Sequence, residues 1–197
     1  MYRGTNKTAI ESQRQITDAL LRLLQDKPFS QISICQICRE AGISRQTFYS
    51  LFESKENVIS YELENNYCMS LTGEVESVSE DTCESIAPCA CSTFSLKEIC
   101  RYYSDYIRSN RAFITLLTEN DMIDCMYDSL LECFLSCDGF LAEGTELDRS
   151  FGANFLAGGI TGVARCYCSK DSTEADDEDG TALEELLYSL LSGKYFE

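Results

Sequence analysis

The feature that most constrains the fold is the series of helix-capping residues within residues 33–56. Ser33 begins S-I-C-Q, the pattern of a capping box, in which the serine oxygen and the Gln36 side chain satisfy amides left unpaired at a helix start. Gly42 can adopt the left-handed conformation that ends a helix, and Ser44 is a second N-cap. The spacing predicts short helices over 34–41 and 45–51, joined by a glycine turn as in a helix-turn-helix.

Helical periodicity covers most of the remaining chain. Apolar residues recur at intervals of three and four, and no stretch alternates convincingly as a strand does. Further N-caps are expected at Ser54, Ser95, Asn110 and Thr181. Residues 72–93 and the acidic run 170–180 are predicted to be connectors. The predicted helices cover residues 8–25, 34–41, 45–51, 55–69, 95–107, 110–117, 122–139, 147–168 and 181–191.

Several apolar faces follow from the same periodicity. In the first helix Ile16, Ala19, Leu20, Leu23 and Leu24 form the predicted face, with Gln13 among the polar residues between them. The face of 95–107 is predicted as Ile99, Tyr102, Tyr103, Tyr106 and Ile107, and that of 122–139 as Met122, Ile123, Met126, Tyr127, Leu130, Leu131, Phe134 and Leu135. The glycines of 147–168 require close approach of a second helix, because each costs up to about 1 kcal/mol in a helix interior.

Charge is distributed unevenly along the 197 residues. Residues 1–55 hold eight Lys/Arg against five Asp/Glu, a balance of +3, and residues 56–197 hold eight against 28, a balance of −20; together these give the formal net charge of −17. The asymmetry indicates an N-terminal module that tolerates polyanions, joined to one that repels them. Neither a signal peptide nor a membrane-spanning segment is recognisable, so we expect a cytoplasmic protein without a membrane partner.

The helix over 45–51 is the candidate for reading nucleic acid. Phe48, with Ile37 and Ile43, is expected to hold it against its neighbours, which leaves Arg45, Gln46, Thr47, Tyr49 and Ser50 outward. Arginine can bind guanine and glutamine can bind adenine, whereas hydroxyls mostly bind phosphate. Lys55 and Ser33 lie at helix starts, where amide groups and the helix dipole favour a phosphate oxygen.

Residues 8–69 resemble the DNA-binding domain of TetR-family (AcrR-like) transcriptional regulators. The resemblance is densest over 34–56, ICQICREAGISRQTFYSLFESKE. Two residues depart from the family pattern: Leu51 stands where histidine or tyrosine is usual, and Glu53 where proline is common. The resemblance implies phosphate contacts by Ser33, Thr47, Tyr49 and Lys55, and base or near-base contacts by Arg45, Gln46 and Ser50, while Arg3 and Lys7 could form an N-terminal arm.

The fold implied by this resemblance is all-α. A three-helix helix-turn-helix DNA-binding domain (1–55) is expected first, with residues 55–72 as a linking helix. An effector-binding and dimerisation domain (73–197) is expected to follow. The implied function is a sequence-specific transcriptional regulator, by family default a repressor released from its operator by a small molecule. The implied partners are a double-stranded DNA operator, a second copy of the chain and an unknown small-molecule effector.

The resemblance also implies two sites in the second domain. One is an effector pocket within 95–168, and the other is a four-helix interface between two copies, formed by the last two long helices. Packing of the glycines within one chain is the alternative to that interface. The pocket candidates are Tyr102, Tyr103, Tyr106, Phe113, Met122, Met126, Tyr127, Phe134 and Phe155, most of which also suit a core. The interface candidates are Gly152, Leu156, Gly159, Val163, Leu183, Leu187 and Leu190.

Twelve cysteines and no histidine leave other functions open. Four pairs, Cys35/Cys38, Cys89/Cys91, Cys133/Cys137 and Cys166/Cys168, could bind a soft metal or respond to oxidation, with Cys89 and Cys91 the best placed. We expect reduced thiols without a metal or other cofactor. No nucleophile with its base is recognisable, so no enzyme is predicted. The alternatives are a thiol- or metal-responsive regulator and a dimeric ligand-binding or interaction protein with a degenerate helix-turn-helix.

Overall fold

The computed structural model describes residues 2, 4–72, 95–136, 144–169 and 181–194, with side chains in the helix over 55–72 only as far as Glu64. Within these residues the chain forms nine α-helices, one short 3₁₀ helix and no strand, so the all-α prediction is confirmed. The predicted connector 72–93 and the run 170–180 fall almost entirely outside the described part. The helices are α1 (Lys7–Asp26), η1 (Phe29–Gln31), α2 (Ile34–Ala41), α3 (Arg45–Leu51), α4 (Lys55–Thr72), α5 (Leu96–Ser109), α6 (Arg111–Glu119), α7 (Asp124–Ser136), α8 (Glu146–Tyr167) and α9 (Thr181–Leu191).

The chain divides into two compact units, Met1–Leu63 and Glu64–Glu197. The division falls within α4, the helix expected to link the two domains. Assigning DNA binding to the first unit and effector binding with dimerisation to the second remains a prediction at this point.

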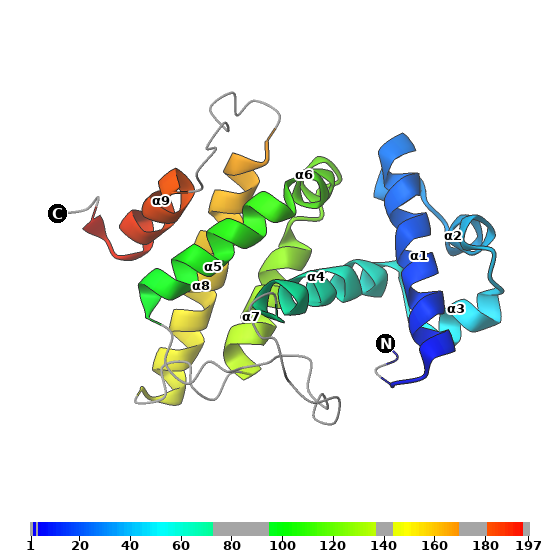
Figure 1. Cartoon of the computed structure of the whole chain (residues 1–197), viewed down its shortest axis with the longest axis horizontal. Coiled ribbons are helices and arrows are strands. Elements are labelled where there is room, and N and C mark those ends of the chain that lie inside the picture. Colours follow the sequence, from blue (N-terminus) through cyan, green and yellow to red (C-terminus); the bar gives the residue numbers. More distant parts are fainter. Residues whose placement is uncertain (1, 3, 73–94, 137–143, 170–180, 195–197) are drawn as a thin grey trace. The chain divides into compact units, whose positions relative to one another are not determined.

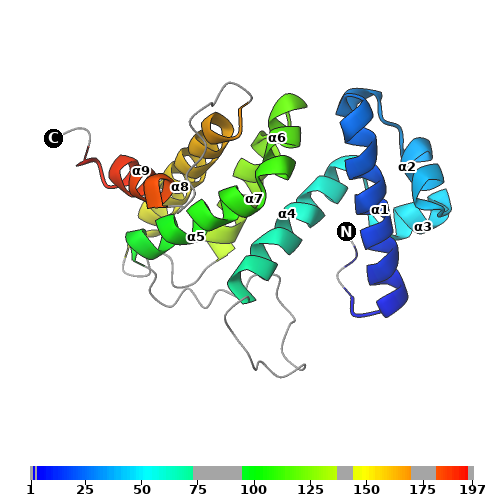
Figure 2. The same ribbon diagram turned by 45° about the horizontal axis from the view of Figure 1, so that its top comes forward.

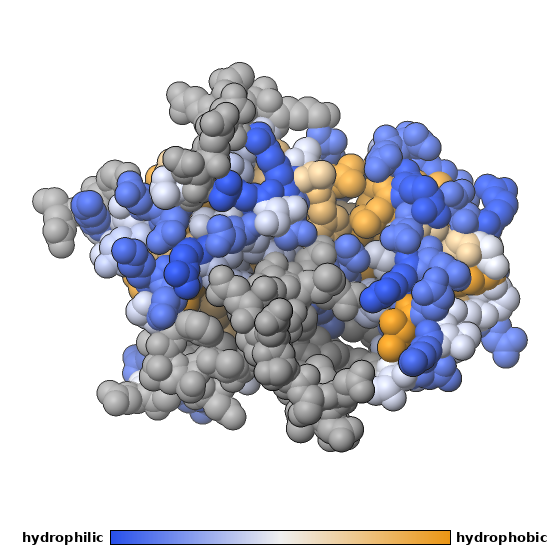
Figure 3. Space-filling view, in the orientation of Figure 1, coloured by the Kyte–Doolittle hydropathy of each residue, from blue (hydrophilic) through white to orange (hydrophobic). Residues whose placement is uncertain are grey.

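The first unit is a three-helix cluster extended by the start of α4. In both ribbon views α1 lies alongside α2 and α3, and all three pairs are in contact (Figures 1 and 2). Ile16, Leu20, Ile37, Phe48 and Phe52 are essentially inaccessible to solvent. Each such side chain stabilises the fold by about 1.5–3 kcal/mol relative to exposure. In the view of Figure 3, hydrophilic residues predominate over α1, with hydrophobic residues showing between them.

The ends of the two short helices follow their caps as predicted. The Ser33 Oγ accepts a hydrogen bond from the Gln36 N–H at 3.3 Å, and the Gln36 Oε1 accepts one from the Ser33 N–H at 2.9 Å. Gly42 has φ 68°, the left-handed conformation that favours glycine. The Ser44 Oγ accepts from the Thr47 N–H at 3.0 Å. The helix-turn-helix therefore has the predicted boundaries.

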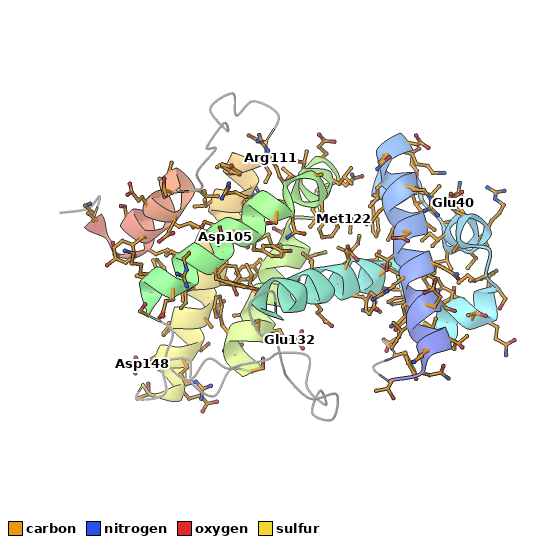
Figure 4. The ribbon with its side chains drawn as sticks, in the orientation of Figure 1. Glu40, Asp105, Arg111, Met122, Glu132 and Asp148 are labelled. Atoms are coloured by element: carbon orange, nitrogen blue, oxygen red, sulfur yellow. The ribbon has the colours of Figure 1, made fainter. Side chains whose placement is uncertain are left out.

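The second unit is a helical bundle in which α8 contacts α6, α7 and α9, and α5 contacts α6 and α9. Its core includes Ile107, Ile114, Met126, Leu130 and Ile160. Thr145 caps α8 through a capping box with Asp148, which is labelled in Figure 4. Hydrogen bonds donated by the Thr145 hydroxyl and then by its backbone N–H lower the pKa of Asp148.

Some predicted faces and caps of this unit differ from the structure. On α5, Cys100 and Ser104 are buried, whereas Ile99 and Tyr102 are only half-buried. α5 packs against α9, and burial, followed by the charge of Glu184 on α9, raises the pKa of Cys100 to about 11. Asn110 makes no side-chain cap for α6; its amide instead donates to the Tyr106 carbonyl at the end of α5. Leu135, near the end of α7, is exposed.

Candidate nucleic-acid interface

The orientation of α3 is set by two apolar side chains. Phe48 and Leu51 are buried, and the Phe48 ring lies 5.9 Å from that of Phe52, centroid to centroid. This anchoring turns the opposite side of the helix outward. Of the side chains predicted to face out, Arg45, Gln46, Tyr49 and Ser50 are exposed, and Thr47 is half-buried. The exposed side of α3 therefore carries the residues predicted to contact bases.

Hydroxyl groups at the start of α3 are linked to the cap. The Thr47 and Ser44 hydroxyls lie 2.8 Å apart, within hydrogen-bond distance. The Ser50 hydroxyl donates to the Thr47 carbonyl at 2.7 Å. Each hydroxyl has one donor hydrogen, whereas a phosphate oxygen accepts hydrogen bonds. The Thr47 hydroxyl can donate to a phosphate oxygen when the Ser44 hydroxyl is the donor of the bond between them.

Arg45 and Tyr49 lie together on the exposed side of α3. The Arg45 guanidinium carbon is 5.9 Å from the Tyr49 ring centroid, and the Tyr49 ring packs edge-on against Phe48 with centroids 5.6 Å apart. A hydrogen bond with the Tyr49 side chain is the largest cause that raises the pKa of Arg45, followed by interaction with Cys35. The guanidinium, which is always charged, thus lies near the Tyr49 ring.

Lys55 lies at the first position of α4 and is half-buried. Its Nζ donates to the carbonyls of Phe29 at 2.7 Å and Ile32 at 2.9 Å, and it lies 4.1 Å from the Phe29 ring centroid. The ammonium has three donors, so one is left for another acceptor. The phosphate contact expected of Lys55 stays a prediction, but the residue also holds η1 and the segment that leads to Ser33.

The N-terminus is tied to the end of α3 in a way that the sequence analysis missed. The Tyr2 N–H donates to the Leu51 carbonyl at 2.8 Å, and the Gln13 Nε2 donates to the Tyr2 carbonyl at 3.0 Å. Gln13, which we placed on the polar side of α1, is 2% exposed. Its position three residues before Ile16 extends the apolar stripe, and that register was the available signal.

An ion pair joins α1 to α2 at the surface. The Arg22 Nε donates to the Glu40 carboxylate at 3.1 Å, and Glu40 is labelled on α2 in Figure 4. Both side chains are substantially exposed, so the pair adds little stability. It does neutralise an acidic group on the helix that precedes Arg45.

Comparison with known proteins relates this part of the chain to a family. The family model described as bacterial regulatory proteins, tetR family, matches residues 16–61, from within α1 to the first part of α4. The helix-turn-helix region of this chain therefore matches the TetR family. The matched residues include both helices of the helix-turn-helix and their caps, which are the parts of the TetR-family resemblance that the sequence showed most densely.

Two TetR-family relatives match over short lengths. The HTH-type dhaKLM operon transcriptional activator DhaS of Lactococcus lactis is 38% identical over 61 residues, 31% of this chain and 33% of that protein. The HTH-type transcriptional regulator EthR of Mycolicibacterium smegmatis is 53% identical over 38 residues, 19% of this chain and 18% of that protein. The chain therefore matches a third or less of each relative's length.

A solved structure extends the likeness in fold. The crystal structure of Lin0861 from Listeria innocua superposes with a TM-score of 0.73 and 18% identity, over 100% of this chain and 97% of that one. At this level of identity the likeness shows the fold alone. It supports the all-helical architecture of the chain beyond the matched helix-turn-helix.

The predicted pocket residues fall into three groups in the second unit. Tyr103, Tyr106, Phe113, Met122, Met126 and Phe134 are buried, and Tyr102 and Tyr127 are half-buried. Phe155 is 60% exposed on α8, and its role as a pocket residue stays a prediction. Tyr103 lies at the centre of an aromatic group, with ring centroids 4.9 Å from Tyr102 and 5.9 Å from Phe134. Burial raises the pKa of Tyr103 well above its usual value.

The predicted dimer residues mostly pack inside the chain. Leu156, Leu183 and Leu187 are buried, and a Cβ added to Gly159 would lie 2.7 Å from the Leu191 side chain, so this glycine permits α8 and α9 of one chain to approach. Gly152, Val163 and Leu190 are half-buried. Periodicity identified apolar faces but could not tell which one meets the same chain. The strongly exposed apolar residues of these two helices are Leu147, Phe151, Phe155, Leu186 and Tyr188.

The two members of a cysteine pair differ in exposure where both are described. Cys35 is exposed and Cys38 buried on α2; Cys166 is exposed and Cys168 buried at the end of α8. Cys89, Cys91 and Cys137 lie outside the described residues. None of the seven cysteines whose side chains are described is in a disulfide, and no group of three or more potential metal ligands occurs among the described residues. In the same part of the chain, no helix is both long and apolar enough to cross a membrane.

Proposed function

We propose that this protein is a sequence-specific DNA-binding transcriptional regulator that inserts α3 into the major groove. The observation that carries the proposal is the two-sided construction of α3: Phe48 and Leu51 are buried, while Arg45, Gln46, Tyr49 and Ser50 are exposed. A short capped helix with a fixed inner side and a polar outer side is what groove reading requires. The family match of the helix-turn-helix region supports the same function.

The roles proposed for the residues follow from their chemistry. Arg45, Gln46 and Ser50 are proposed to contact bases or their immediate surroundings, because guanidinium and amide groups bind purine edges in pairs of hydrogen bonds. Ser33, Thr47, Tyr49 and Lys55 are proposed to contact phosphates, as hydroxyl, ammonium and helix-start amide groups do. Phosphate contacts set the register of the helix, and base contacts set the sequence that it selects.

A homodimer is proposed to present two copies of α3 to adjacent major-groove segments, about 34–36 Å apart on one side of the duplex. We place the contact on Leu147, Phe151 and Phe155, hereafter the α8 stripe, which recur every four residues and are 60–67% exposed in the single chain. Leu186 of α9, 40% exposed, is proposed to join it. Exposed aromatic side chains at helical spacing are costly unless a partner covers them.

A small-molecule effector is proposed to bind in the second unit near the aromatic group of Tyr102, Tyr103 and Phe134, which lies between α5 and α7. Aromatic rings and tyrosine hydroxyl groups in one place suit an apolar or aromatic ligand that also carries a hydrogen-bonding group. Repression relieved by the effector is the expectation from the family. One relative is named an activator, so the sign of regulation must be measured.

The test of the proposed function is selection of bound fragments from a genomic library by the purified protein, followed by binding to a recovered site over a range of salt concentrations. We expect a recurrent, twofold-symmetric sequence, with affinity that falls as salt rises because phosphate contacts release counterions. Adding candidate effectors to the same assay measures release. Absence of any enriched sequence, with uniform weak binding to every fragment, would support the ligand-binding or interaction protein instead.

A further inference from the structure

Two thiols lie at the start of the first helix of the helix-turn-helix. Cys35 and Cys38 are three residues apart on α2, which places their side chains about 60° apart around the helix and therefore on one side. Cys35 is exposed and Cys38 is only 4% exposed. One sulfur is thus open to a solute, and its neighbour is shielded from competing reactions.

Arg45 is close to both thiols. Its guanidinium interacts electrostatically with Cys35 and with Cys38, and the two cysteines interact with each other. Arg45 is also the first residue of α3 and one of the proposed base contacts. Chemistry at this thiol pair therefore takes place beside a group that is proposed to read DNA.

The backbone connects Cys38 directly to the turn before α3. Its carbonyl accepts a hydrogen bond from the Ile43 N–H at 3.0 Å, and Ile43 immediately precedes the cap residue Ser44. The neighbouring Arg39 carbonyl accepts from the Gly42 N–H at 3.3 Å. A displacement of Cys38 is consequently transmitted through this turn to the start of α3.

Helix geometry places a disulfide within reach but not without distortion. Residues three apart in an α-helix have Cα atoms about 5 Å apart, inside the roughly 4.4–6.8 Å that a disulfide spans. Their Cβ atoms are about 5–6 Å apart, whereas a disulfide requires roughly 3.5–4.5 Å. Forming the bond must therefore draw the first turn of α2 together by about 1 Å. Such strained bonds are readily reduced, which suits a reversible modification.

We propose that Cys35 and Cys38 are a thiol modification site at which a peroxide forms an intrahelical disulfide that displaces α3 and weakens DNA binding. The effect on DNA rests on the proposed function; the chemistry at the thiols does not. The Cys35 thiolate attacks one oxygen of hydrogen peroxide, giving a sulfenic acid and, after proton uptake, water. The Cys38 sulfur then attacks the Cys35 sulfur, the S–O bond breaks, and the hydroxide leaves as a second water with the Cys38 proton.

The order of the two steps follows from burial. Desolvation is the main cause that raises the pKa of Cys38, and the nearby Cys35 raises it further, while Arg45 lowers it. A thiol that stays protonated is a poor first nucleophile towards peroxide. Cys35, which is exposed to the oxidant, takes the first step, and Cys38 resolves the sulfenic acid.

The chemical test uses a peptide that isolates the pair. Trypsin cleaves after Arg22 and Arg39 but not between Lys27 and Pro28, so residues 23–39 are released as one peptide with Cys35 and Cys38 as its only cysteines. The full-length protein is treated with hydrogen peroxide, quenched in acid, alkylated and digested. We expect the peptide to lose two hydrogens and resist alkylation, and dithiothreitol to reverse both changes. Two alkylated cysteines in this peptide after oxidation would overturn the proposal.

The functional test compares variants on a DNA site selected by the reduced protein. Peroxide is expected to lower the affinity of the wild type by about tenfold or more, as expected when a base-reading arginine is displaced. Cys35→Ser should be insensitive, whereas the matched control Cys166→Ser, which removes an exposed thiol of α8, should respond like the wild type. Equal loss of affinity in Cys35→Ser would refute the proposed control of DNA binding. If the reduced wild type selects no DNA, the proposed function fails, and the peptide assay still reports whether the disulfide forms.

Discussion

The ammonium of Lys55 lies 4.1 Å from the centroid of the Phe29 ring and donates a hydrogen bond to the carbonyl of that same residue. Its second bond, to the Ile32 carbonyl, ends one residue before the cap of α2. The first residue of α4 therefore fastens the segment that leads into the helix-turn-helix. A lysine assigned to phosphate by resemblance also has a structural partner inside the domain.

Substitution of Lys55 by methionine should separate these two roles. The methionine keeps much of the apolar stem but removes the donors and the charge. We expect the free energy of unfolding to fall by about 1–2 kcal/mol, towards the lower part of the range for charged hydrogen bonds because the side chain is only half-buried. Urea denaturation measures the change, and Lys7→Met, at an exposed position of α1, is the control. Unchanged stability with reduced DNA affinity would leave phosphate binding as the only role of Lys55.

Gln13→Ala should release the N-terminal residues from the end of α3. The variant removes the side-chain donor to the Tyr2 carbonyl, so the hydrogen bond from the Tyr2 N–H to the Leu51 carbonyl loses its support. We expect faster hydrogen exchange at the Tyr2 amide and a loss of stability of about 1 kcal/mol. Gln15→Ala changes the same residue type at an exposed position of α1 and should alter neither quantity. Similar exchange rates in both variants would show that the bond does not restrain the terminus.

Arg45→Ala should reduce sequence discrimination more than overall DNA affinity. A base contact by arginine is worth about 1–3 kcal/mol against the wrong base, and its loss leaves the phosphate contacts intact. Competition between a selected site and its single-base variants measures this directly. Arg14→Ala, which removes an exposed charge from α1, is the control for a general loss of positive charge. Undiminished discrimination by the Arg45 variant would remove this residue from the proposed base contacts.

Phe151→Glu should dissociate the proposed dimer. Phe151 is 67% exposed at the centre of the α8 stripe, so the substitution adds charge where two acidic units must meet without unfolding the single chain. Light scattering after gel filtration should give the mass of one chain for the variant and of two for the wild type. Leu135→Glu, which replaces an exposed leucine of α7 outside the stripe, should remain dimeric. A dimeric Phe151 variant would place the interface elsewhere.

Prediction from sequence succeeded where the cause of structure is local. The boundaries of α2 and α3 were predicted residue for residue, because Ser33, Gly42 and Ser44 act on backbone groups within a few residues of themselves. The inward side of α3 could equally be predicted from the sequence, because two short amphipathic helices share a core only if Phe48 and Ile37 both face inward.

Prediction failed where a residue had several possible partners. Periodicity marks a side of a helix as apolar, but it does not say whether the same chain or a second copy covers it. Leu183 and Leu187 are buried in their own bundle, while Phe151 and Phe155 stand exposed. The hydrogen bond from Gln13 to the Tyr2 carbonyl could not be predicted for the same reason, since it joins residues eleven positions apart.

The sequence by itself determined the helices 34–41 and 45–51, their caps and the turn at Gly42, because these depend on interactions between near neighbours in the chain. Only the tertiary structure decided that Lys55 binds the carbonyls of Phe29 and Ile32, that Tyr2 meets the end of α3, and that the Cys38 carbonyl supports the turn leading to Arg45. Contacts of this kind depend on how whole helices pack, and packing is set by the combined shape of many side chains rather than by any local pattern.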